Sequence, residues 1–140
     1  MIRLLTLILF CFISFNSFAQ FSMSNQTVYE CYGTLTDSEA NSLNAGWYDH
    51  NENYAFTICP SNTLSITIDF TSFNTEPTND YVMIYDGPNI TYPVLAGPFS
   101  GTNIPPQIIS TGCVTIVFIS DLNVAAEGFE LVWEAEVTQP

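Results

Sequence analysis

The chain has 140 residues and a formal net charge of −13, with 14 acidic residues and Arg3 as its single Lys or Arg. Because affinity for phosphates comes mostly from Lys and Arg, this composition excludes nucleic-acid binding, attraction to anionic lipid and a Lys-dependent phosphate loop. The length allows one domain with a hydrophobic core of its own. A partner selected by charge is cationic, either a metal ion or a basic protein surface.

The first 19 residues have the pattern of a secretory signal peptide. Arg3 supplies the positive start, residues 4–15 form the apolar stretch, and residues 17–19 resemble a signal-peptidase site. The apolar run ends too early for a membrane anchor, which needs about 20 residues. We therefore expect cleavage before Gln20 and a secreted, extracellular protein with no membrane insertion after cleavage.

After the signal, apolar residues recur with the period of two that is typical of strands, and no helical period appears. The expected strands are 27–29, 33–36, 54–58, 64–70, 81–85, 94–96, 107–110, 114–118 and 129–137. One face of the strand at 64–70 is expected in the core: Leu64, Ile66, Ile68 and Phe70. Residues 37–53 are expected to be mostly loop. Strands at roughly ten-residue spacing, without crossover helices, predict an antiparallel sandwich or barrel.

Several sequence strings occur in the order typical of one known family. They are CYGTLTD, YAFTI, LSITIDFTSFNTE, NDYVMIYDGPN, PVLAGPFSGT, PPQIISTG, VTIVFISD and EGFELVW. Together they resemble a CUB domain over residues 28–137, preceded by an N-terminal extension at 20–27. The resemblance implies an all-β fold, an antiparallel β-sandwich with jelly-roll topology. It also implies a secreted, non-catalytic module that binds a protein or an extracellular matrix component.

The cysteines depart from the animal CUB pattern, which has two disulfides. Cys31 matches the first position of that pattern, but its usual partner position falls near Tyr54, and the second pair is absent. Cys59 and Cys113 stand at the ends of two predicted strands, and both fall on the face opposite to the core residues beside them. Their sequence contexts, TICP and GC, resemble those of secreted bacterial relatives. The resemblance favours a Cys59–Cys113 disulfide, which leaves Cys31 free or bonded to another chain. A Cys31–Cys59 disulfide is the alternative.

The resemblance further implies a calcium site at one end of the sandwich. Glu76, Asp80 and Asp121 match the three carboxylates of the family pattern, and Asn123 matches a position that adds a backbone or side-chain oxygen. Carboxylates and carbonyls are the hard oxygen ligands that Ca²⁺ prefers. No Lys or Arg follows Arg3 to neutralise these acids, although they are also compatible with three solvated loop residues. Partners of CUB domains often place a Lys or Arg at this position, so we expect a partner protein with exposed basic residues.

Two other functions stay open at this point. Trp47, Tyr48 and Tyr54 flank the long polar loop, where they either stack on sugar rings, as in a carbohydrate-binding module, or pack at the sandwich end. Cys31 offers a route to a disulfide-linked structural surface subunit. We expect no enzyme, because His50, the single histidine, lies in a polar loop and no nucleophile motif accompanies it.

Overall fold

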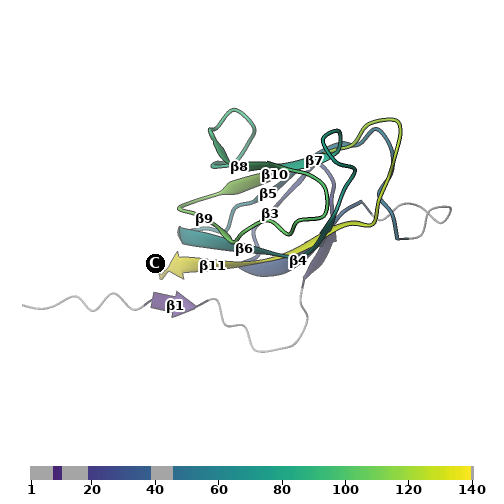
Figure 1. Cartoon of the computed structure of the whole chain (residues 1–140). Coiled ribbons are helices and arrows are strands. Elements are labelled where there is room, and N and C mark those ends of the chain that lie inside the picture. The colour runs from purple at the N-terminus through teal and green to yellow at the C-terminus, as the bar shows by residue number, and fades with distance from the viewer. Residues whose placement is uncertain (1–7, 11–18, 39–45, 140) are drawn as a thin grey trace, which may run out of the picture.

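The computed structural model describes residues 8–10, 19–38 and 46–139, which form two packed β-sheets without a helix (Figure 1). The first sheet has the strand order β2 (Gln20–Ser22), β4 (Tyr32–Thr36), β11 (Gly128–Thr138), β6 (Thr63–Asn74), β9 (Ile108–Ser110), and β1 (Ile8–Phe10) also pairs with β11. The second has the order β3 (Gln26–Val28), β5 (Asn53–Ile58), β10 (Val114–Ile119), β7 (Tyr81–Tyr85), β8 (Val94–Phe99). Among the described residues we find no helix able to cross a membrane.

The predicted all-β sandwich is confirmed, with one difference at its edges. Strands β2 and β3 run parallel to their neighbours β4 and β5, whereas the other paired strands are antiparallel. Residues 20–28 pass from one sheet to the other and contribute an edge strand to each. The segment expected to be an extension at 20–27 is thus part of the sandwich. Strand β1 lies within the predicted signal peptide, so cleavage before Gln20 would remove its pairing with β11.

Aromatic rings fill the core near one end of the sandwich. Phe118 of β10 lies between Tyr48 and Phe129, with ring centroids 5.0 Å and 5.4 Å away. Phe129 in turn contacts Phe70 and Phe73 of β6, at 6.0 Å and 6.4 Å. Because these rings come from both sheets, they hold the loops above them at a fixed separation.

Two irregularities in the pairing of β6 with β11 change which residues face the core. Register shifts leave Leu64 and Thr71 without a direct partner on β11. A bulged residue interrupts the inward–outward alternation. The prediction that Leu64 faces the core is therefore wrong, since it is 42% exposed. At the other bulge, two exposed residues, Thr71 and Ser72, separate the buried rings of Phe70 and Phe73. The bulge at Thr71 lies shortly before the turn that carries Glu76 and Asp80.

The predicted Cys59–Cys113 disulfide is present, and it joins β5 to β10 with a Cα–Cα distance of 4.4 Å. The two cysteines are neighbours because Ile58 pairs with Val114 in the adjacent antiparallel strands. This bond excludes the Cys31–Cys59 alternative. Cys31 is also disulfide-bonded in the structure of the full 140-residue chain, where we had expected it to be free or bonded to another chain.

Candidate metal centre

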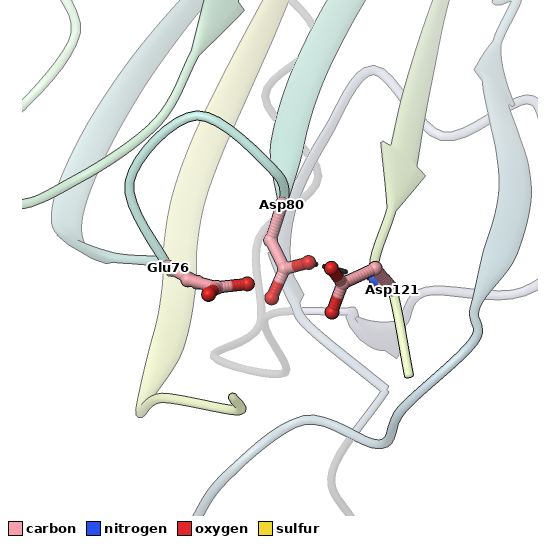
Figure 2. A group of neighbouring side chains, drawn as sticks. All are labelled: Glu76, Asp80 and Asp121. Atoms are coloured by element: carbon pink, nitrogen blue, oxygen red, sulfur yellow. Dashed lines mark hydrogen bonds between the residues drawn. The ribbon is translucent and has the colours of Figure 1, made fainter. Parts of the chain in front are cut away.

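Three carboxylates converge at one end of the sandwich (Figure 2). The Cys59–Cys113 disulfide lies at the opposite end of β10. Glu76 and Asp80 lie in the turn between β6 and β7, and Asp121 lies just beyond β10. Each offers an oxygen within 4.8 Å of the others. We call these three residues the acidic corner. They come together because β7 and β10 are antiparallel neighbours, which places the start of one beside the end of the other.

Asp80 is the centre of the acidic corner and is completely buried. Its Oδ2 accepts a hydrogen bond from the Tyr48 hydroxyl at 2.6 Å, and its Oδ1 accepts one from the Asp121 amide at 2.8 Å. Its backbone carbonyl accepts a further bond from the Thr75 hydroxyl at 3.1 Å. Hydrogen-bond donors on both oxygens fix the orientation of this buried carboxylate.

Tyr48 positions the acidic corner, a role that the sequence analysis missed. Besides donating to Asp80, its hydroxyl accepts a hydrogen bond from the Glu76 amide at 2.9 Å. Burial and the hydrogen bond to Asp80 raise the pKa of the Tyr48 hydroxyl, so it remains a protonated donor. The predicted stacking of Tyr48 on sugar is wrong, because the side chain is completely buried. Its place beside a polar loop suggested exposure, and only the tertiary contacts reveal its burial.

The other two aromatic residues of the predicted sugar platform do not form a shared surface with Tyr48. Trp47 is 51% exposed. Tyr54 is half-buried and packs against the hydrophobic core. The alternative of packing at the end of the sandwich therefore holds for Tyr48 and Tyr54, and Trp47 alone among the three is left open to a ligand.

Asn123 lies next to the acidic corner and orients one of its members. Its amide donates to Asp121 Oδ1 at 2.8 Å, and its side-chain Nδ2 lies 3.4 Å from Asp121 Oδ2. The groups that Asn123 directs at Asp121 are thus both donors.

The acidic corner has the donor set of a site for a hard cation. Oε2 of Glu76 is buried and has no hydrogen-bond partner among the described residues. An orphaned carboxylate oxygen beside two further carboxylates is costly unless a positive charge compensates it. No Lys or Arg follows Arg3 in the sequence, so the described part of the chain contains neither. The residues fit a divalent cation such as Ca²⁺, which binds clustered carboxylate oxygens.

The fold and this site define a class of protein, the jelly-roll β-sandwich with carboxylates on the loops at one end. The family model described as CUB domain matches residues 31–133, and the chain belongs to the CUB family. CUB domains are non-catalytic binding modules, typically extracellular ones that interact with other proteins. The predicted family, fold and absence of catalysis are confirmed.

Relatives in two vertebrates match most of this chain but little of their own length. Embryonic protein UVS.2 of Xenopus laevis is 33% identical over 112 residues, which cover 74% of this chain and 21% of that protein. Cubilin of Canis lupus familiaris is 36% identical over 117 residues, which cover 74% of this chain and 3% of that protein. The chain thus spans about a fifth or less of these curated relatives.

Among solved structures, the chain resembles the MASP-1 CUB2 domain bound to Ca²⁺. The TM-score is 0.65 at 26% identity, and the match covers 80% of this chain and 99% of that one. The likeness therefore extends over a whole isolated CUB domain.

Proposed function

We propose that this chain is a secreted binding module that holds Ca²⁺ at the acidic corner and recognises a protein or extracellular matrix component there. Glu76, Asp80 and Asp121 supply carboxylate oxygens, and Asn123 adds a side-chain or backbone oxygen after a small rotation. A bound ion orders the loops, and the remaining negative charge accepts an exposed Lys or Arg of the partner. Residues 1–19 act as the signal peptide and are removed.

The convergence of three carboxylates, with no Lys or Arg in the described part of the chain to compensate their charge, carries this proposal. The buried orphan Oε2 of Glu76 points to a ligand, because solvated loop acids have no reason to withdraw an oxygen from water. The Ca²⁺-bound MASP-1 CUB2 domain supports calcium as the cation, since its fold resembles this one. Extracellular modules bind Ca²⁺ with dissociation constants of about 10⁻⁴–10⁻³ M.

Thermal unfolding of residues 20–140 in EGTA and in 10 mM Ca²⁺ tests the metal site. Binding to the folded state at this affinity adds about 1.4–2.7 kcal/mol, which raises the melting temperature by several degrees. We expect a smaller rise with Mg²⁺ and no rise in Asp121→Asn, which keeps an acceptor for Asn123. Glu134→Gln, an exposed change on β11, serves as the matched control and should respond like the wild type. A wild type that does not respond to Ca²⁺ contradicts the proposal.

Binding to immobilised basic and acidic peptides tests the partner class. We expect the basic peptide to bind in Ca²⁺ and to be released by salt or by Asp121→Asn. The carbohydrate-binding alternative now depends on Trp47 alone. Glycan-array binding that is lost in Trp47→Ala but kept in Asp121→Asn would replace our proposal with that alternative.

A further inference from the structure

Glu52 is a buried carboxyl group outside the acidic corner. It immediately precedes β5, and only 5% of it is exposed. Its Oε1 accepts hydrogen bonds from the Ser38 hydroxyl and from the Asp49 amide, the latter at 3.2 Å. Its Oε2 is buried and has no hydrogen-bond partner among the described residues. Because an ionised carboxylate is costly to bury with an unsatisfied oxygen, this environment favours the neutral acid.

Among the residues that the structure describes, the charged groups that act on Glu52 are both acidic. Asp49 lies in the same turn, and Asp37 follows β4; the residue that faces Glu52 from beyond β10 is the uncharged Ser120. Burial raises the pKa of the Glu52 carboxyl from 4.5 to about 7, and the charges of Asp49 and Asp37 contribute to the rise. The hydrogen bonds from Ser38 and Asp49 oppose it. Glu52 therefore changes its charge near neutral pH.

The backbone around Glu52 is tied to the segment that carries Asp121. The Glu52 amide donates to the Ser120 hydroxyl at 2.9 Å, and the Glu52 carbonyl accepts from the Ser120 amide at 3.1 Å. The Asn51 amide donates to the Asp121 carbonyl at 2.7 Å. At the other end of this turn, Tyr48 holds the other two members of the acidic corner. The turn formed by residues 48–52 thus contacts all three carboxylate residues.

We propose that Glu52 is a positioning residue: as a neutral acid it lets the 48–52 turn stay closed over its buried side chain, whereas the ionised carboxylate favours exposure to water, which loosens the turn and weakens cation binding at the acidic corner. The cation-binding half of this inference rests on the proposed function, whereas the closure of the turn needs no metal. The expected affinity for Ca²⁺ falls as the pH rises through neutrality. A site built of carboxylates alone shows the opposite trend, since protons compete with the cation at low pH.

Amide hydrogen exchange in EGTA tests the closure by itself. We expect the protection factors of the Tyr48 and Asn51 amides to fall by about tenfold between pH 6 and pH 8, and to stay constant in Glu52→Gln. Asp49→Asn keeps the backbone donor but removes a neighbouring charge, so it should move the midpoint to lower pH. If Glu52→Gln does not fold, the shifted pH midpoint in Asp49→Asn still tests whether the ionisation of Glu52 opens the turn. Glu134→Gln should behave like the wild type.

Calorimetric titration with Ca²⁺ at pH 6 and pH 8 tests the coupling. We expect the wild type to bind about fivefold or more weakly at pH 8, and Glu52→Gln to bind equally at both values. A wild type with constant protection, or a Glu52→Gln variant with the wild-type pH dependence, overturns the role of Glu52. Absence of Ca²⁺ binding at both pH values overturns the proposed calcium site and the coupling, while the exchange measurement still decides the closure.

Discussion

Replacing Tyr48 with Phe removes one oxygen atom that serves two buried hydrogen bonds. The lost bonds are the 2.6 Å donation to Asp80 and the 2.9 Å acceptance from the Glu76 amide. A hydrogen bond to a charged group contributes about 1.5–3 kcal/mol, and a buried amide left unpaired costs about 1–3 kcal/mol. The ring stays in place against Phe118, so no cavity is created. We expect the free energy of unfolding of the metal-free protein to fall by about 3 kcal/mol.

Urea unfolding in EGTA measures this loss, and Tyr54→Phe provides the matched control. Tyr54 is half-buried, and its hydroxyl makes no hydrogen bond with any residue that the structure describes, so its loss should cost less than about 0.5 kcal/mol. A double-mutant cycle with Asp80→Asn should give a coupling energy of about 1.5–3 kcal/mol between Tyr48 and Asp80. If Tyr48→Phe costs no more than Tyr54→Phe, the hydroxyl does not hold the acidic corner and our account of the site is refuted.

Three further predictions concern stability. Replacing Cys59 and Cys113 with Ser together should lower the free energy of unfolding by about 4 kcal/mol in urea, because the disulfide closes a loop of 54 residues; an unchanged midpoint would contradict this. Gly33→Ala should cost about 1–3 kcal/mol, since its Cβ would lie 2.3 Å from the Trp133 ring, and wild-type stability would show that the indole moves freely. Glu52→Gln should stabilise the protein at pH 8 by up to about 3 kcal/mol, because a carboxyl pKa raised from 4.5 to about 7 opposes folding at high pH. That gain should shrink below pH 7 and vanish below pH 4.5, as measured by unfolding across this range; a constant difference would contradict it.

Local patterning was sufficient to predict most of the strands. Alternation of apolar and polar residues identified β7 at its observed bounds, and β5, β10 and β11 within one residue at each end. Strand β2 was missed because three residues at the edge of a sheet are too few for their alternation to stand out from the surrounding sequence. The family pattern singled out the three carboxylates, and the parity of Cys59 and Cys113 agreed with their pairing.

The sequence by itself thus determined the strands, the family and the set of acidic residues without a basic counterpart. Only the tertiary structure decided which of these side chains lose contact with water. Leu64 is exposed because a bulge removes it from the core face, whereas Tyr48 and Glu52 are buried by strands distant in the sequence. Alternation is a property of neighbouring residues and can be read along the chain. Burial depends on what the opposite sheet and the end loops place above each residue, and so it emerges only when the sheets pack.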